Sequence, residues 1–144
     1  GVGLLKQALP NGRRGAACDV TAITSMWADV DYGTVGHKKA NLPPDEAAAL
    51  RLLRQVSRCQ PSIIVHTGHG LQAYWLLKEP LTTIPFDQEA AIAARQWSML
   101  VRATARAAGY DADATGDITR LMRLPGTTNW KIPTAAKPVE ICDG

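Results

Sequence analysis

The stretch PSIIVHTGHGLQAYWLLK, residues 61–78, predicts two β-strands joined by a glycine-rich turn. Its first half is short, apolar and β-branched, and it is interrupted by Gly68 and Gly70. Its second half, LQAYWLLK from Leu71, has the composition and length of a partner strand. We therefore expect an antiparallel hairpin in the middle of the chain.

One strand and one helix are predicted upstream of this hairpin. Residues 20–31, VTAITSMWADVD, begin with β-branched residues and end in alternating ones, which is typical of a strand. Two prolines followed by Asp45 and Glu46 form a helix-start signal, and this helix ends before Pro61. Its apolar residues repeat at helical spacing: Ala49, Leu52, Leu53 and Val56.

A second helix and a last strand are predicted downstream. Residues 86–108 are rich in alanine, and Gly109 is suited to be their C-terminal cap. One stripe of this helix carries Ile92, Met99 and Ala103. Its arginines predict a solvated face, with contact to a nucleic-acid backbone as the alternative: Arg95, Arg102 and Arg106. Residues 139–142 predict the final strand.

The order of these elements is strand, helix, strand, strand, helix, strand. This β-α-β-β-α-β order is typical of ferredoxin-like and RNA-recognition-motif-like folds. We therefore expect an α+β domain with an RNA-recognition-motif-like sheet and helices on one face. Residues 1–18 predict an N-terminal arm or loop, and residues 19–144 the domain itself. Because the chain begins with Gly1 rather than Met, we expect it to be a piece of a longer protein.

Composition excludes several classes of protein. The 144 residues are 46% hydrophobic and 20% charged, which excludes disorder, collagen and a disulfide mini-scaffold. The net charge of +3 neither requires nor excludes a polyanionic partner. Three widely spaced cysteines without a C-x-x-C pair argue against a zinc or disulfide framework and favour a reducing compartment. No apolar run approaches the roughly 18 residues that cross a bilayer, so we expect a cytoplasmic protein without a membrane partner.

Asp29 and Asp31 stand two residues apart at the end of the first predicted strand. Because side chains alternate on a strand, both carboxylates are expected to point the same way. Such neighbours repel each other unless a cation or a shared proton relieves them. Mg²⁺ prefers oxygen ligands, commonly one or two carboxylates plus substrate phosphates. The pair fits a metal site, and the alternative is a solvated turn.

The hairpin turn, HTGHG at residues 66–70, combines glycines with two imidazoles and a hydroxyl group. Glycines let a backbone approach a phosphate closely, and an imidazole there could contact a nucleotide triphosphate. The alternative is that the glycines serve only the turn geometry and that His66 and His69 are exposed.

A third polar group lies between the long helix and the last strand. It begins with Asp113 and Asp117 and continues as RLMRLPGTTNWK, residues 120–131. Residues 118–139 hold four basic residues and no acidic one, so the local field is positive. Arginine binds phosphate bidentately and lysine adds a point charge. The alternative is a solvated basic loop. Trp130 is a candidate contact, whereas the other tryptophans are expected in the core: Trp27, Trp75 and Trp97.

These three groups, taken in order, resemble the motifs of the archaeo-eukaryotic primase superfamily. They are WADVD at residues 27–31, PSIIVHTGHGLQAYW at 61–75 and DATGDITRLMRLPGTTNWK at 113–131. The resemblance is greatest to primase-polymerase domains of plasmids, phages and other mobile elements, and it covers roughly residues 25–142. It implies a catalytic core with an RNA-recognition-motif-like sheet, in agreement with the order of elements.

The resemblance also implies roles for individual residues. Asp29 and Asp31 match the paired-acid motif, and with Asp113 they would hold one or two Mg²⁺ or Mn²⁺ ions. Asp117 is the alternative third acid.

Thr67, Gly68 and His69 resemble the second motif with Thr in place of Ser. The contact to the nucleotide is left open between His66, His69 and Gln72. The other nucleotide-binding residues that we expect lie in the basic segment: Arg120, Arg123, Asn129 and Lys131.

The implied activity is that of a DNA primase or polymerase. Such an enzyme transfers nucleotides from nucleoside triphosphates to a nucleic-acid 3′-hydroxyl in a metal-dependent reaction, here in replication of a mobile element or a related system. The expected partners are nucleoside triphosphates, a single-stranded DNA template or primer–template, and a helicase or accessory domain in the same or a neighbouring chain. Two alternatives stay open: a non-catalytic nucleic-acid-binding replication initiator and a metal-dependent nuclease.

Overall fold

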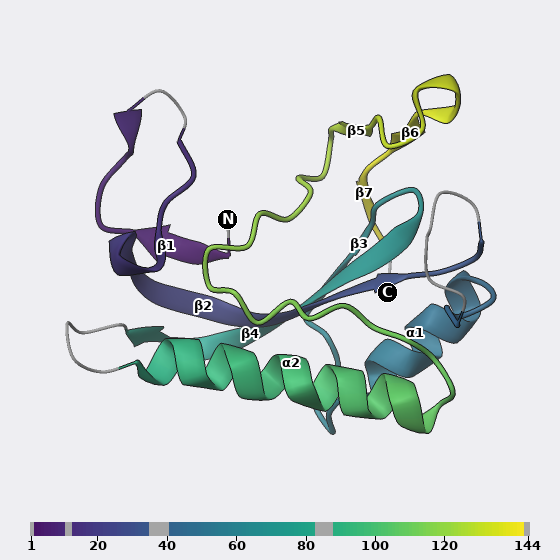
Figure 1. The fold of residues 1–144 in the computed structure, drawn as a ribbon, viewed down its shortest axis with the longest axis horizontal. Coiled ribbons are helices and arrows are strands. Elements are labelled where there is room, and N and C mark those ends of the chain that lie inside the picture. The colour runs from purple at the N-terminus through teal and green to yellow at the C-terminus, as the bar shows by residue number, and fades with distance from the viewer. Residues whose placement is uncertain (1, 11–12, 35–40, 83–87, 143–144) are drawn as a thin grey trace.

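The computed structural model describes residues 2–10, 13–34, 41–82 and 88–142 (Figure 1). The strands are β1 (Gly3–Leu5), β2 (Val20–Asp31), β3 (Ile63–His66), β4 (Gly70–Thr82), β5 (Thr128–Asn129), β6 (Lys137–Pro138) and β7 (Glu140–Ile141). The α-helices are α1 (Glu46–Gln55) and α2 (Glu89–Ala107). Short 3₁₀ helices span Ala17–Asp19 and Pro133–Ala135.

The main sheet is antiparallel, with the strand order β1-β2-β4-β3-β7. The long strands β2 and β4 form its centre, and β5 pairs with β6 in a separate ribbon. The hairpin predicted from residues 61–78 is confirmed, because β3 pairs antiparallel with β4. The two helices lie together on one side of the curled sheet (Figure 1). The mixed α+β class is thus confirmed.

The outer strands differ from the expected RNA-recognition-motif-like order. In that order the last strand lies beside the first core strand, whereas β7 pairs with β3 at the opposite edge. The place beside β2 is taken by β1, which belongs to the segment expected to be an arm or loop. The physical reason is the path of the chain after α2, which crosses the sheet before β7 and so arrives at the edge formed by β3. The domain boundary near residue 19 stays a prediction.

Helix α1 forms as its sequence predicts. The Asp45 carboxylate caps it by accepting a hydrogen bond of 2.7 Å from the Ala48 N–H group. Its predicted apolar face is buried and packs on the sheet through Leu52 and Leu53. The sheet residues on this side include Ala28 and Val30 of β2. Because side chains alternate along a strand, Asp29 and Asp31 point to the other face of the sheet, away from α1.

Helix α2 buries a different stripe from the one that its sequence suggests. Its buried residues are mostly small: Ala90, Ala94, Ser98, Val101 and Ala105. The stripe that carries Ile92 and Met99 faces solvent, because Ile92 is 48% and Met99 67% exposed. The reason is close packing, since an added Cβ on Gly116 would lie 2.9 Å from the Ala94 carbonyl oxygen. Small side chains therefore face inward and larger ones face solvent.

Candidate nucleotide and metal site

Asp29 and Asp31 lie on the face of β2 that the helices leave open. Both alternate with Val30, which is buried in the core under α1. In the register with β4, Asp29 is opposite Gln72 and Asp31 is opposite Gly70. A Cβ on Gly70 would lie 3.0 Å from an Asp31 carboxylate oxygen, so glycine lets β4 begin close to this acid. The carboxylates therefore share one face, as alternation predicts.

The Asp29 carboxylate experiences opposing electrostatic influences. Burial first, and then the charge of Asp31, raise its pKa above the ordinary value. The Arg120 guanidinium, 3.2 Å from an Asp29 oxygen, lowers that pKa and only partly offsets the increase. Burial together with the Asp29 charge also raises the pKa of Tyr74 to about 12. The charges of Asp29 and Asp31 therefore repel each other, and a further cation at this place would stabilise them.

The turn between β3 and β4 is held by its own hydrogen bonds. The Thr67 hydroxyl donates to the Gly70 carbonyl at 2.9 Å, and Gly68 adopts a positive φ of 85°. His69 is only 5% exposed, which rules out an exposed imidazole at this position. His66 lies on the helix side, where its Nε2 is 3.0 Å from a Glu46 carboxylate oxygen. Of the three alternatives for a nucleotide contact, Gln72 alone is paired in register with Asp29.

The basic segment after Ile118 connects the acidic pair to this turn. Arg120 contacts Asp29, and the Arg123 N–H group donates to the Gln72 side-chain oxygen at 3.0 Å. The buried Asn129 side chain donates to the Thr67 carbonyl at 2.6 Å. The Asn129 side-chain oxygen accepts from the Arg123 guanidinium at 3.2 Å and from the Lys131 N–H group at 3.0 Å. Three groups far apart in sequence are therefore joined by one hydrogen-bond network.

The expected set of three metal-binding acids is not assembled. Among the residues that the structure describes, which include Asp29, Asp31, Asp113 and Asp117, no group of three or more acidic, histidine or cysteine side chains could hold a metal ion. Asp113 lies half-buried in the segment after α2, and Asp117 is held elsewhere. The expected ligand set Asp29, Asp31 and Asp113 stays a prediction.

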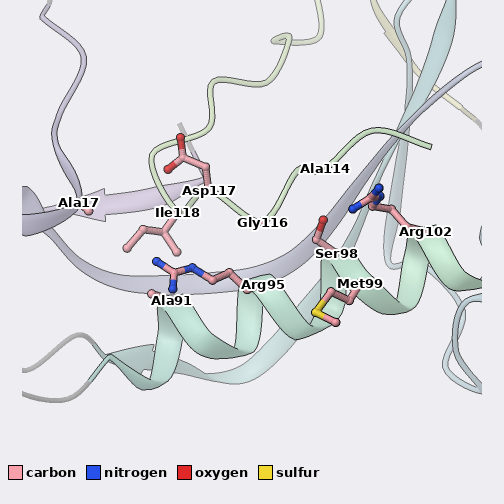
Figure 2. A pocket seen from close by; sticks show the side chains of 10 residues that line it. All are labelled: Ala17, Ala91, Arg95, Ser98, Met99, Arg102, Ala114, Gly116, Asp117 and Ile118. Carbon is pink, nitrogen blue, oxygen red and sulfur yellow. The ribbon is translucent and has the colours of Figure 1, made fainter. Parts of the chain in front are cut away.

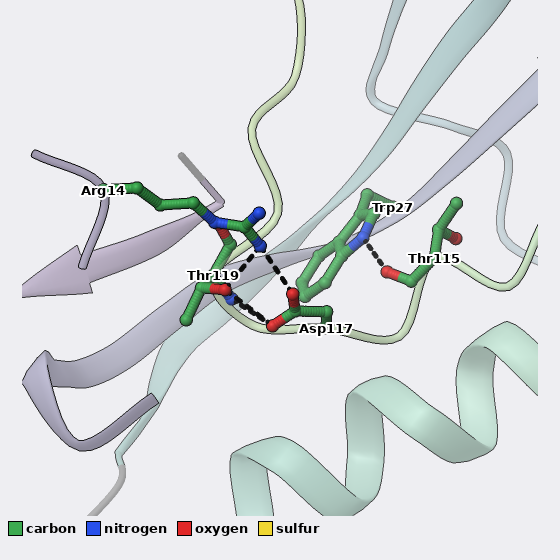
Figure 3. Close-up of polar contacts among 5 residues, drawn as sticks. All are labelled: Arg14, Trp27, Thr115, Asp117 and Thr119. Atoms are coloured by element: carbon green, nitrogen blue, oxygen red, sulfur yellow. Dashed lines mark hydrogen bonds and ion pairs between the residues drawn. The ribbon is translucent and has the colours of Figure 1, made fainter. Parts of the chain in front are cut away.

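Asp117 is held by Arg14 and Thr119 (Figure 3). Its carboxylate lies 2.6 Å from the Arg14 guanidinium and accepts from the Thr119 N–H and hydroxyl groups at 2.9 and 2.8 Å. Partial burial raises its pKa, but the bonds from Thr119 and the Arg14 charge outweigh burial and lower it. The same segment is anchored where the Trp27 indole donates to the Thr115 carbonyl at 2.7 Å. These contacts hold residues 115–119 against Arg14 and Trp27.

The two carboxylates on β2 nevertheless fit a hard divalent cation. Mg²⁺ is commonly held by one or two carboxylates, with water and substrate phosphates completing its coordination. Asp29 and Asp31 supply such oxygens on one face, and the raised pKa of Asp29 indicates charge that a cation would stabilise. The donor chemistry therefore suits Mg²⁺ or Mn²⁺ with a triphosphate, without a third acid from the described residues.

Two hollows in the described structure lie away from the acidic pair. One, of about 520 Å³, lies between α2 and residues 114–118 (Figure 2). The other, of about 680 Å³, lies between α1 and the edge formed by β3 and residues 141–142. The acidic pair lines neither of them. The charged groups are united by the hydrogen-bond network around Asp29 and not by either hollow.

One polar cluster was not foreseen from the sequence. The Tyr32 hydroxyl and the His66 Nε2 lie 2.6 Å apart, and Glu46 of α1 completes the cluster. Burial first, and then the Glu46 charge, raise the pKa of Tyr32 to about 12. The only signal for this cluster in the sequence was that Tyr32 directly follows Asp31. The predicted burial of Trp27 and Trp75 is confirmed, and Trp97 is partly buried against the same core. Trp130, the candidate contact, is 66% exposed.

No helix among the described residues is both long and apolar enough to span a membrane.

Comparisons with known proteins give one informative result. No family model matches the sequence, and no curated protein matches it. The solved AEP domain of the cyanophage S-2L primase-polymerase (PrimPol) is similar in structure, with a TM-score of 0.59 and 20% sequence identity. The similarity covers 89% of this chain and 56% of that chain, so this chain spans little more than half of the solved one. The chain therefore has the fold of an archaeo-eukaryotic primase-type PrimPol domain.

Proposed function

We propose that the chain is a metal-dependent nucleotidyltransferase of the DNA primase-polymerase type. The observation that carries this proposal is the network joining the acidic pair on β2, the turn at Thr67 and the basic segment that contains Arg120. Acids that suit a metal therefore lie beside cations that suit a triphosphate. The substrates are nucleoside triphosphates and a DNA template or primer–template.

Each group has a defined task in this proposal. Asp29 and Asp31 hold one or two Mg²⁺ or Mn²⁺ ions, which when bound supply the charge that activates a 3′-hydroxyl and steadies the leaving pyrophosphate. Arg120 contacts Asp29 at 3.2 Å, and its five donors allow it to bind a phosphate of the triphosphate as well. Arg123 and Lys131 add positive charge that stabilises the triphosphate as its charge shifts toward the leaving group. No covalent protein nucleophile takes part.

A second candidate function is a nucleic-acid-binding module without catalysis. The observation in its favour is that no third acid joins Asp29 and Asp31 among the described residues. This module would bind DNA without divalent metal and would not bind nucleotides. A third candidate, a metal-dependent nuclease, would use the same two carboxylates for hydrolysis.

Extension of a labelled primer on a DNA template, with Mg²⁺ or Mn²⁺ and all four deoxynucleoside triphosphates, separates these functions. We expect extension by the unaltered chain. We also expect at least about a 100-fold loss in Asp29→Ala and in Asp31→Ala, the order lost when a preorganised charged group is removed. The control is Glu79→Gln, which changes an exposed acid on β4.

Outcomes of the same assay rule the proposal out. Full extension by both aspartate variants, with folding verified by circular dichroism, would falsify it. Shortening of the labelled DNA in metal without nucleotides would identify the nuclease. DNA binding without extension or nucleotide binding would favour the non-catalytic module.

A further inference from the structure

The solvent-exposed face of α2 carries an alternating row of apolar and basic side chains. These residues are Ile92, Arg95, Met99, Arg102 and Arg106, and all of them are exposed. Their spacing of three and four residues places them on one face of the helix. Close packing of the alanine face against the sheet and residues 114–118 is what turns this row outward. An exposed row of basic and apolar side chains suits a partner that carries both anionic groups and apolar surface.

Part of this row lines the groove between α2 and residues 114–118. Arg95, Met99 and Arg102 form one wall, and Gly116 and Asp117 lie on the other (Figure 2). Asp117 is the acid in this lining among the described residues, and Arg14 already neutralises it at 2.6 Å. The groove, of about 520 Å³, therefore carries an excess of positive charge.

Neither groove arginine is engaged within the part of the chain that the structure describes. The ion pairs there join Arg14 to Asp117, His66 to Glu46 and Arg120 to Asp29, and Arg95 and Arg102 take part in none of them. Their guanidinium groups are therefore available to an anionic ligand. Arg95 and Arg102 are seven positions apart, about 10 Å along the helix, so two successive anionic groups on one polymer could reach both.

We propose that this groove binds a single strand of nucleic acid. Arg95 and Arg102 bind backbone phosphates, and Met99 between them contacts an unpaired base through its polarisable sulfur. Proteins that bind single strands combine a positively charged groove with side chains, usually aromatic, that contact the faces of bases, and here Met99 would supply that contact. A duplex would bring phosphates but no free base face to Met99, so the alternation favours a single strand.

The groove and the proposed nucleotide site are joined by one segment of the chain. The groove wall at Asp117 is three residues from Arg120, which contacts Asp29. The role of a strand bound in the groove, as template or primer, rests on the proposed function. Binding of the strand itself does not rest on it, because the groove includes no residue of the acidic pair.

Binding of a fluorescently labelled single-stranded oligonucleotide, without nucleotide or divalent metal, tests this proposal through its salt dependence. The test variant is Arg95→Ala with Arg102→Ala. The control is Arg51→Ala with Arg54→Ala, which removes the same charge from exposed positions of α1. Two lost phosphate contacts should reduce the slope of log affinity against log salt by about 1.4. The unaltered chain should then lose roughly sevenfold more affinity than the test variant between about 50 and 200 mM salt.

The result that would overturn the proposal is a test variant with the affinity and salt slope of the control. A Met99→Ser variant adds a second measurement, because it should weaken binding without changing the slope. Binding of a labelled nucleoside triphosphate with Mn²⁺ distinguishes the two proposals. If the test variant binds the nucleotide normally but loses the oligonucleotide, both stand. If neither the unaltered chain nor its variants bind the nucleotide, but the oligonucleotide results are as expected, then the proposal of single-strand binding in the groove is retained and the proposed function fails.

Discussion

Asp29 is the residue whose chemistry most clearly departs from a structural role. Its pKa is raised from an ordinary value of 3.8, with burial as the first cause and Asp31 as the second. Folding therefore favours the protonated form, so its ionised form opposes folding at neutral pH. A nearby cation would remove this unfavourable effect of the ionised Asp29 on folding. If the residue had only a structural role, a neutral side chain at this position would give a more stable protein.

Replacement of Asp29 by Asn should therefore increase the free energy of unfolding at pH 7. The folded state holds the proton more tightly than the unfolded one, so stability in the unaltered chain rises as pH falls through the folded pKa toward 3.8. Asn has a similar shape without the charge, and the difference between the two proteins should shrink as the pH is lowered. Urea unfolding at pH 7 and at acidic pH measures it. A variant less stable than the unaltered chain at pH 7 would contradict this interpretation.

Asn129 shows how one residue can join distant segments. Its amide donates to the Thr67 carbonyl, and its oxygen accepts from Arg123 and from the Lys131 N–H group. The sequence indicated a phosphate-binding role for this residue. The structure places it buried between the turn and the basic segment, where it sets the position of both. Its contribution is therefore to hold the cations in place.

The helices and strands that were predicted best from the sequence are those whose signals lie within their own residues. The β3–β4 hairpin follows from β-branched residues and from glycines at its turn, and α1 follows from the Asp45 cap and an apolar repeat. The buried stripe of α2 was not identified from the sequence, because hydrophobicity alone does not reveal how closely a neighbour packs. The edge strands β1 and β7 are short, and only long-range pairing determines where they lie.

The close packing of α2 gives a prediction at the scale of elements. Replacement of Gly116 by Ala would place a Cβ 2.9 Å from the Ala94 carbonyl oxygen and from the Arg95 Cα. Both neighbours are backbone atoms, so the segment has to move away from the helix. We expect a loss of about 1–3 kcal/mol in the free energy of unfolding, the range for overpacked sites. An unchanged urea midpoint would show that this contact is not tight in solution.

At the scale of the whole molecule, residues 117–123 face two regions. Asp117 lines the groove beside α2, whereas Arg120 and Arg123 reach the open face of the sheet. Sequence alone predicted that acidic and basic groups would meet, through the resemblance of three ordered motifs. It could not predict that Arg14 would bind Asp117, or that Trp27 would anchor Thr115, since these contacts span about a hundred residues. The position of the third acid depends on those contacts.

The central claim is that the acidic pair and the basic segment form one metal-dependent nucleotide site. Titration of a fluorescent nucleoside triphosphate into the chain, with and without Mn²⁺, tests it most directly. We expect binding that requires Mn²⁺ and that is lost in Asp31→Ala but retained in Glu79→Gln. Binding of equal strength without Mn²⁺, or unchanged in Asp31→Ala, would contradict it.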